Sequence, residues 1–138
     1  MRLILQVFIF ICLNFSVVYA QDLEEVATIR LKKDEQKKIL VEYKKHKKLF
    51  KFRWTLYQNG GLVIHRSYDR IVAQNILYQR HKNRSFRLDL MPTGTKYYRA
   101  PYFLVVFKEF DYETNEAIFK IFLSDAELQI ILKNLENS

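Results

Sequence analysis

The chain has 138 residues, 49% of them hydrophobic, and carries 23 Lys and Arg against 15 Asp and Glu, a net charge of +8. This length fits one domain, and the hydrophobic content excludes intrinsically disordered, collagen-like and low-complexity classes. Patterns along the chain predict a targeting segment over residues 1–20 and a single small β-rich domain over residues 21–138.

The first 20 residues have the layout of a secretory signal peptide. Arg2 precedes an apolar run, and Val18–Ala20 supplies residues that signal peptidase accepts at its cleavage site. Gln6 and Asn14 interrupt the run, which makes it short for a membrane span of about 20 residues. We expect cleavage after Ala20, with no transmembrane segment left in the mature chain. A retained N-terminal anchor is the alternative.

Cleavage would also remove Cys12, the one cysteine of the sequence. The mature domain would then contain no disulfide, thiol nucleophile or cysteine-ligated metal. An exported domain without cysteine that is rich in Lys, Ile, Phe, Tyr and Asn is typical of a bacterial periplasmic protein. The composition therefore favours the bacterial periplasm over another secreted location.

Residues 22–48 carry a strand pattern. Ile39, Val41 and Tyr43 alternate with other residues at the spacing of a strand. Ile29 and Leu31 offer a partner strand across the polar turn between the two segments. Acidic and basic residues four positions apart leave a helix as the alternative. The pattern favours strands here.

The strongest strand signal lies in residues 49–67, where large apolar residues alternate with polar ones and a turn of the type found in tight hairpins follows at Asn59-Gly60-Gly61. Pairing of Tyr57 with Leu62 would close this hairpin. The alternation would then place His65 beside Trp54 on an aromatic face. The opposite face would carry the basic residues. These are Lys51, Arg53 and Arg66.

Two more hairpins are predicted further along the chain. Ile71–Gln79 and Phe86–Met91 flank a basic turn, and Tyr102–Phe110 and Ala117–Leu123 flank a polar one. The segment Tyr102–Phe107 is apolar on both faces, which is typical of a central, covered strand. Two prolines and a glycine between the two hairpins indicate a loop.

The C-terminal segment changes its period. Ser124 and Glu127 fit a helix capping box, and four apolar residues follow at helical spacing. They are Leu128, Ile131, Leu132 and Leu135. We therefore expect a mainly β fold, an antiparallel meander forming a curled sheet or small barrel, with one C-terminal amphipathic α-helix. A two-layer sheet covered by that helix is the alternative.

Charge is distributed unevenly along the sequence. Residues 30–99 contain 19 bases and five acids, whereas residues 100–138 contain three bases and seven acids. Such asymmetry is typical of a contact surface for an anionic partner. Charge runs are also common on faces that only meet solvent.

Aromatic residues lie among these bases, and together they form the predicted binding residues. Bases attract anionic groups, while flat rings stack on sugars or other rings. The candidates are Lys51, Arg53, Tyr57, Arg66, Lys96, Tyr97, Tyr98 and Arg99, with Tyr102 beside the last four. Export argues against nucleic acid as the partner and favours an anionic envelope component, such as a glycan or lipid headgroup, or an acidic protein.

Catalytic and metal-binding patterns are weak. His46, His65 and His81 fall in different predicted elements, so neither a metal nor a cofactor is expected. Asp69 and Asp89 are two acids within the basic region. If the fold held their carboxylates about 5–9 Å apart, they could act as the catalytic pair of a glycoside hydrolase. Their neighbours are arginines, which favours ion pairing instead.

The sequence as a whole therefore predicts an exported, non-catalytic binding protein with a basic surface. Two other functions remain as alternatives. One is a structural or assembly subunit that pairs through exposed strands. The other is a hydrolase that uses Asp69 or Asp89. Neither the specific ligand nor the oligomeric state follows from the sequence.

Overall fold

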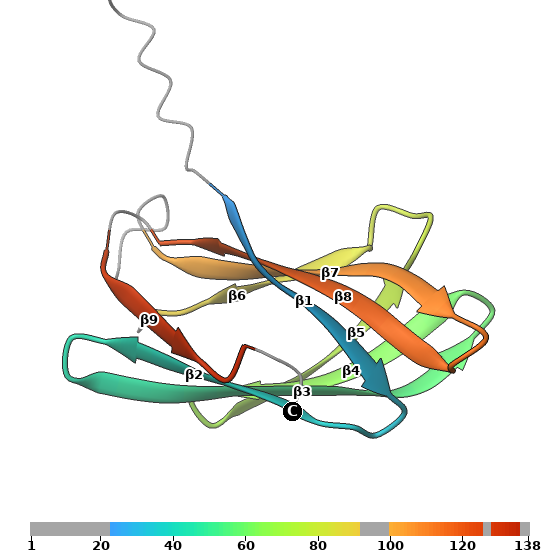
Figure 1. Cartoon of the computed structure of the whole chain (residues 1–138), viewed down its shortest axis with the longest axis horizontal. Coiled ribbons are helices and arrows are strands. Elements are labelled where there is room, and N and C mark those ends of the chain that lie inside the picture. The colour runs from blue at the N-terminus through green and yellow to red at the C-terminus, as the bar shows by residue number, and fades with distance from the viewer. Residues whose placement is uncertain (1–22, 92–99, 126–127, 136–138) are drawn as a thin grey trace, which may run out of the picture.

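The computed structural model describes residues 23–91, 100–125 and 128–135, which form nine strands and no helix (Figure 1). The strands are β1 Glu24–Lys32, β2 Lys37–Tyr43, β3 His46–Gln58, β4 Gly61–Tyr68, β5 Ile71–Tyr78, β6 Ser85–Asp89, β7 Tyr102–Asp111, β8 Glu116–Ser124 and β9 Ile130–Lys133. The mainly β prediction is confirmed.

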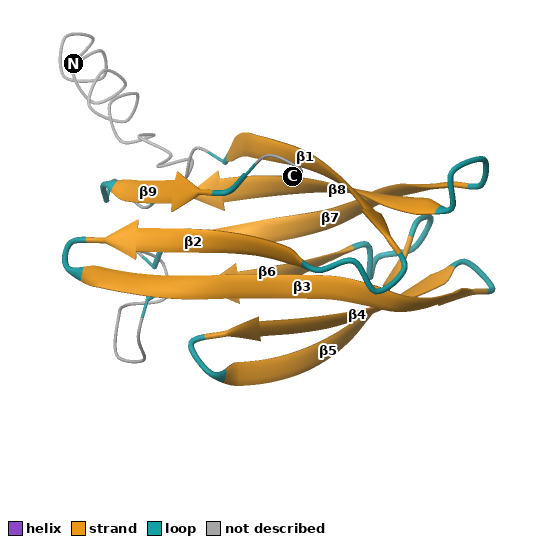
Figure 2. Cartoon of the chain, turned by 60° about the horizontal axis from the view of Figure 1, so that its bottom comes forward, coloured by secondary structure: helices purple, strands orange, loops and turns teal. Residues whose placement is uncertain are grey.

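Two antiparallel sheets face each other (Figure 2). The four-stranded sheet has the order β1-β8-β7-β6, and the five-stranded sheet has the order β5-β4-β3-β2-β9. Within the described residues both sheets keep open edges, so the fold is a sandwich. The small barrel expected as one form of the meander is therefore wrong, because the chain crosses between two layers instead of closing one sheet on itself.

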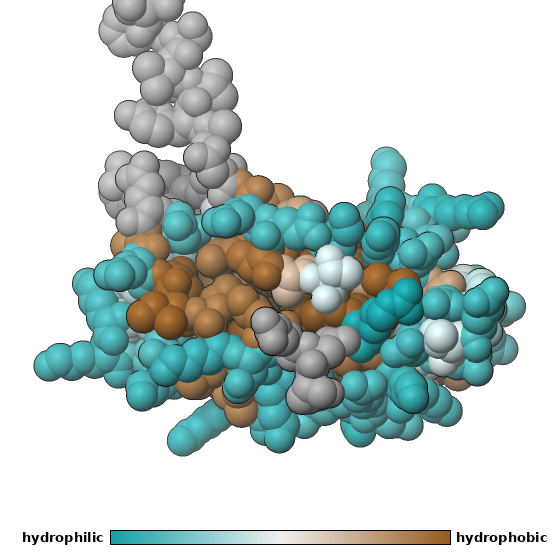
Figure 3. All heavy atoms as spheres, viewed as in Figure 1, coloured by the Kyte–Doolittle hydropathy of each residue, from teal (hydrophilic) through white to brown (hydrophobic). Residues whose placement is uncertain are grey.

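The core is built from the alternate residues of both sheets that point inward. Phe52 of β3 meets Phe119 of β8 edge to face, with ring centroids 5.4 Å apart. Phe50 lies 5.8 Å from Phe103 of β7. In the space-filling view, hydrophobic atoms form a band between two polar margins, along the line where the two sheets meet (Figure 3). The position of β7 between β6 and β8 confirms the predicted central strand.

The β3–β4 hairpin forms as predicted, with Tyr57 opposite Leu62. Asn59 and Gly60 have φ values of 52° and 77°, the left-handed conformation that a two-residue hairpin turn requires. A bulge between Trp54 and Leu56 reverses the facing of the residues after it relative to the alternation of the residues before it.

The bulge makes two predictions about this hairpin wrong. Trp54 pairs with Ile64 on the inner face and donates a hydrogen bond from Nε1 to the Leu31 carbonyl at 2.7 Å. His65 instead lies opposite Arg53 on the outer face. His65 is therefore not a core residue beside Trp54. The shared basic face with Arg66 is wrong for the same reason, because Arg66 pairs with buried Phe52.

Two predicted strand pairings are also wrong, although the strands themselves are present. β1 pairs with β8 and β2 with β3, because the turn at residues 33–36 carries the chain from one sheet to the other. The Asp34 amide donates to the Trp54 carbonyl at 2.9 Å and fixes this crossing. The basic turn after β5 crosses in the same way, so β6 pairs with β7 instead of β5. The β7–β8 hairpin is confirmed.

The predicted C-terminal helix is wrong. Residues Ile130–Lys133 form β9, which pairs with Leu40–Tyr43 of β2. Ile130 and Leu132 pack against the core, while Ile131 and Lys133 are exposed. As a strand, this segment provides hydrogen-bond partners for the backbone N–H and C=O groups at the edge of β2. This pairing outweighs the helical spacing of the apolar residues. The expected signal peptide over residues 1–20 lies outside the described residues, as does Glu127 of the capping box.

Candidate functional site

Six of the described basic side chains project from the outer face of the five-stranded sheet, and two of them, Lys47 and Lys133, lie beside Glu42. The other four are Lys38, Lys51, Arg53 and His65, and we call them the basic face. Alternation places them there, because β3 turns Phe50, Phe52 and Trp54 inward and the residues between them outward.

The basic face brings like residues together in two cross-strand pairs. Lys38 of β2 lies directly opposite Lys51 of β3, and Arg53 of β3 lies directly opposite His65 of β4. Within the described part of the chain, none of the four side chains takes part in an ion pair. Their positive potential is therefore directed to solvent.

Carboxylates near the basic face are already engaged by other bases. On the same side of the sheet, Lys133 Nζ lies 2.9 Å from Glu42 Oε1, and Lys47 Nζ lies 3.8 Å from the same oxygen. The close contact with Lys133 lowers the pKa of Glu42, although partial burial acts in the opposite direction. In the β4–β5 turn, Asp69 Oδ2 accepts a hydrogen bond from Lys48 Nζ at 2.8 Å. Neither acid is free to neutralise the basic face.

Apolar side chains border the basic face. Leu56, Val63 and Ile76 form one cross-strand row over β3, β4 and β5. Leu56 and Ile76 are each 48% exposed, and Val72 of β5 is 76% exposed. The outer surface of this sheet therefore combines positive charge with exposed hydrophobic area, which is more typical of a contact surface than of a purely solvated one.

Tyr57, a predicted binding residue, lies away from the basic face. Its ring stacks on Phe110 at 4.1 Å, and its hydroxyl is 2.9 Å from that of Tyr112. Burial, followed by the Tyr112 contact, raises the pKa of Tyr57 to about 12. These rings line an open hollow of about 610 Å³ that Lys32 and Lys33 also border. The hollow has both rings and bases.

Arg66 is another predicted binding residue that the structure separates from Lys51 and Arg53. Its guanidinium lies 4.8 Å from the Phe86 ring, and its Nε donates to Asn75 Oδ1 at 2.7 Å. Burial lowers the pKa of Arg66. These contacts fix Arg66 at the inner side of the sheet.

The remaining predicted binding residues are Lys96–Arg99 and Tyr102. Lys96, Tyr97, Tyr98 and Arg99 lie outside the described residues. Tyr102 is on the outer face of the four-stranded sheet, where the Arg87 guanidinium lies 3.7 Å from its ring centroid.

Asp69 and Asp89 are each paired with a base. Arg87 Nε lies 2.9 Å from Asp89 Oδ1, while Asp69 binds Lys48. The geometry therefore gives the hydrolase alternative no support.

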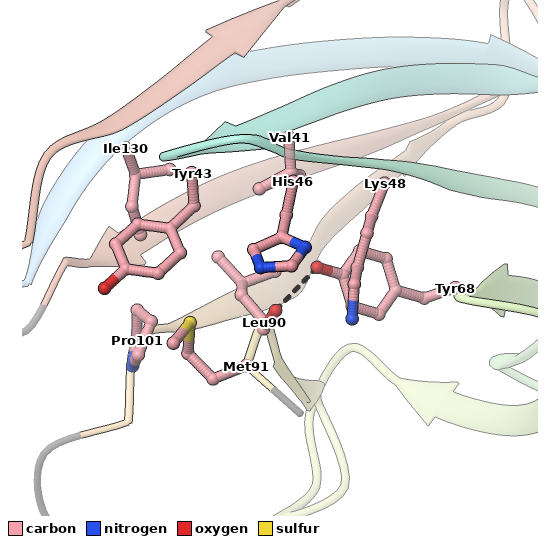
Figure 4. Close-up of a pocket in the computed structure, with 9 residues that line it drawn as sticks. All are labelled: Val41, Tyr43, His46, Lys48, Tyr68, Leu90, Met91, Pro101 and Ile130. Atoms are coloured by element: carbon pink, nitrogen blue, oxygen red, sulfur yellow. Dashed lines mark hydrogen bonds between the residues drawn. The ribbon is translucent and has the colours of Figure 1, made fainter. Parts of the chain in front are cut away.

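A small pocket of about 20 Å³ lies at one end of the sandwich (Figure 4). His46 and Lys48 point into it from β3, and the Tyr68 hydroxyl donates to the Leu90 carbonyl at 2.7 Å. Because Lys48 is held by Asp69, two of the polar side chains around this pocket are already engaged.

Sequence reasoning missed Lys38 and His65 as members of the basic face. The signal for Lys38 was present, since Ile39 and Val41 alternate with outward residues and Lys44-Lys45 forms the turn to β3. His65 could be placed only with the bulge known. The described residues contain no group of three or more His, Cys, Asp or Glu side chains placed to hold a metal ion.

Among the residues that the structure describes, no helix is long and apolar enough to cross a bilayer. Comparison of the chain with protein-family models, curated proteins and solved structures finds no match.

Proposed function

We propose that this protein is a non-catalytic binding protein that holds an anionic partner against the basic face. The observation that carries the proposal is the placement of base opposite base in the pairs Lys38–Lys51 and Arg53–His65. Like charges directly opposite each other in a sheet destabilise it by about 0.2–1 kcal/mol, and Lys38 and Lys51 form such a pair. A negatively charged partner would remove this repulsion on binding.

The surroundings of the basic face support the same function. Glu42 and Asp69 are occupied by lysines, so the face cannot be neutralised from within the sheet. The row of exposed apolar residues beside it would add contact area that salt does not screen. An anionic partner with some apolar surface therefore suits this face better than a simple ion.

The proposal includes export to the periplasm or another extracellular compartment. It is supported by Arg2, the apolar run and Val18–Ala20 of the sequence. The intact mass of the protein recovered from its native host should correspond to a chain beginning at Gln21. Recovery of the full-length chain from the cytosol would contradict this part of the proposal.

Binding is tested with the full chain and three anionic probes: heparin, phosphatidylglycerol vesicles and polyglutamate. At least one should bind at low salt and weaken steeply as salt is raised, because exposed charges are screened over roughly 8–10 Å at physiological salt. The double variant Lys51→Glu/Arg53→Glu should bind about tenfold more weakly or worse.

A matched variant on the other sheet controls for total charge. Lys108→Glu/Lys120→Glu makes the same change of charge on β7 and β8 and should change affinity by less than about twofold. Equal losses for the two double variants would show that only net charge matters. Failure of all three probes to bind at low salt would reject the proposed function.

A further inference from the structure

The four sheet edges in the described structure differ in how they are protected. β9 has four residues and carries Lys133, and β6 has five residues and carries Arg87 and Asp89. β1 begins with two glutamates and has a bulge after Glu25. Short length, charge and bulges are the features that prevent edge strands from pairing with other chains. These three edges are therefore protected.

β5 has none of these features. It is an eight-residue strand, IVAQNILY, with no charged residue and no proline, and its register with β4 is continuous. Figure 2 shows β5 at the margin of the five-stranded sheet. Ile71 is 72% exposed, and Val72 is the most exposed of the large apolar residues described. This edge combines unprotected backbone with apolar side chains.

The hairpin geometry defines which backbone groups of β5 point away from β4. Asp69 and Arg70 form a two-residue turn with φ values of 49° and 67°, so Tyr68 and Ile71 are a hydrogen-bonded pair. Alternation then directs the N–H and C=O groups of the next residue, Val72, away from β4, and likewise those of Gln74 and Ile76. The Tyr78 amide continues this series, since it turns outward to the Asn83 carbonyl at 2.9 Å.

Basic residues flank both ends of this edge. Arg70 lies in the turn before β5, and Arg80, Lys82 and Arg84 lie in the segment after it, all of them exposed. The acid beside Arg70 is Asp69, which is held by Lys48. A strand lying along β5 would therefore be surrounded by positive charge, with the basic face on the adjoining strands.

We infer that β5 accepts an extended acidic segment of another polypeptide, which adds to the five-stranded sheet as a sixth strand. The inference rests on the proposed function and specifies its anionic partner as a protein. Backbone hydrogen bonds to Val72, Gln74 and Ile76 would hold the added strand, and its carboxylates would meet the flanking arginines. Apolar residues in alternate positions would extend the row formed by Leu56, Val63 and Ile76.

A second copy of this chain is a poorer occupant. Antiparallel pairing of two β5 strands about Gln74 would place Val72 opposite Ile76 of the other copy. It would also place Arg70 opposite the other copy's position 78, within two residues of that copy's Arg80. Like charges at both ends of the pair would repel, whereas an acidic strand would be attracted.

The test uses the full chain and a synthetic peptide that alternates valine or threonine with glutamate. A second peptide of the same sequence has N-methyl groups on the amides of one edge, which removes hydrogen-bond donors and keeps the charge. The unmodified peptide should slow hydrogen exchange of the Val72, Gln74 and Ile76 amides. It should also bind at least about tenfold more tightly than the methylated peptide.

A variant of the edge provides the complementary measurement. Gln74→Pro removes one outward N–H without breaking a bond to β4, and proline is tolerated at such edge positions. It should lower affinity for the peptide about tenfold, while Gln74→Thr, which keeps the N–H, should lower it less than about twofold. The far-UV circular dichroism spectrum and the thermal unfolding transition should be nearly unchanged in both variants, which shows that the fold is intact.

Three results would overturn the inference. If the two peptides bind equally and Gln74→Pro has no effect, β5 is not the docking edge, and the proposed anion binding stands on the other probes. If sedimentation shows a dimer that Gln74→Pro abolishes, the occupant is a second copy. If neither the peptide nor any polyanion binds at low salt, the inference and the proposed function fail together.

Discussion

The two sheets have similar inner faces and different outer ones. The strands of the four-stranded sheet carry five bases and six acids, and three of the bases take part in ion pairs: Arg30–Asp111 at 3.1 Å, Arg87–Asp89 at 2.9 Å and Lys120–Glu25 at 3.7 Å. The strands of the five-stranded sheet carry eight bases and one acid, Glu42. One outer face is balanced by its own residues, and the other is not.

This difference shows how an asymmetry along the sequence becomes an asymmetry in space. Residues 37–78 supply β2, β3, β4 and β5, which lie in one sheet, and the acidic residues 100–125 supply β7 and β8, which lie in the other. Both sheets bury aromatic rings in the same core. Packing in a common core therefore requires apolar residues on the inner faces of both sheets, whereas the outer faces can differ in charge.

The largest expected effect tests whether the inner faces are equivalent. Trp54→Ala in the five-stranded sheet and Phe119→Ala in the four-stranded sheet should each lower the free energy of unfolding by about 3–5 kcal/mol, because both side chains are buried. Urea denaturation measures both. Trp54→Phe is the control that keeps a ring but loses the bond to the Leu31 carbonyl. A loss below about 1 kcal/mol for either alanine variant would show that the two faces are not equivalent.

A smaller effect tests a polar link between the sheets. The Tyr68 hydroxyl of β4 reaches the Leu90 carbonyl, which follows β6 of the other sheet. Tyr68→Phe should cost about 1–3 kcal/mol in thermal unfolding, because the carbonyl would stay buried without its donor. Tyr112→Phe, at an exposed hydroxyl, should cost less than about 0.5 kcal/mol. Equal losses would mean that Tyr68 contributes only packing.

The stacked contact between Tyr57 and Phe110 also joins the sheets, and it predicts a pH dependence. Burial and the Tyr112 contact raise the pKa of Tyr57 to about 12 from its usual value of 10.0. The folded state therefore keeps this proton when the unfolded state has lost it. The stabilisation is complete below pH 10 and declines as pH rises toward 12. Unfolding of Tyr57→Phe should depend less on pH in this window, and an unchanged slope would contradict the assignment.

The smallest expected effect tests the unbalanced outer face itself. Lys38→Glu would replace a like pair with an opposite pair beside Lys51 and should stabilise the protein by about 0.2–1 kcal/mol. Lys120→Glu on the other sheet would break the contact with Glu25 and should destabilise it by up to about 1 kcal/mol. Calorimetry can resolve the opposite signs. If Lys38→Glu destabilises the protein, the two lysines do not repel each other.

Much of the fold could be predicted because local alternation determines local structure. The β3–β4 and β7–β8 hairpins follow from the alternation and turn residues of their own segments. The assignment of strands to sheets could not be predicted, since the segments around Ile29 and Ile39 have the same alternation although β1 and β2 lie in different sheets. β9 was missed because its apolar residues fit a helix in isolation, and pairing with β2 decides otherwise.

The candidate site was predicted only where alternation holds without interruption. Lys51 and Arg53 project outward as expected, because they precede the bulge. Beyond it the facing reverses relative to the prediction, so Arg66 and Tyr57 turn inward and His65 outward. A bulge depends on the packing of two sheets around Trp54 and leaves no clear mark in the local sequence.

The pairing of β1 with β8 has a consequence for how the chain reaches this structure. Glu24 lies opposite Leu123, so the first described strand has no partner until almost the whole chain is available. Closing so long a loop costs more chain entropy than closing a tight turn, and pairings of this kind form slowly. The β3–β4 hairpin, closed by Asn59 and Gly60, carries no such cost. Folding should therefore proceed from the middle of the sequence outward, and the first strand should be among the last to join.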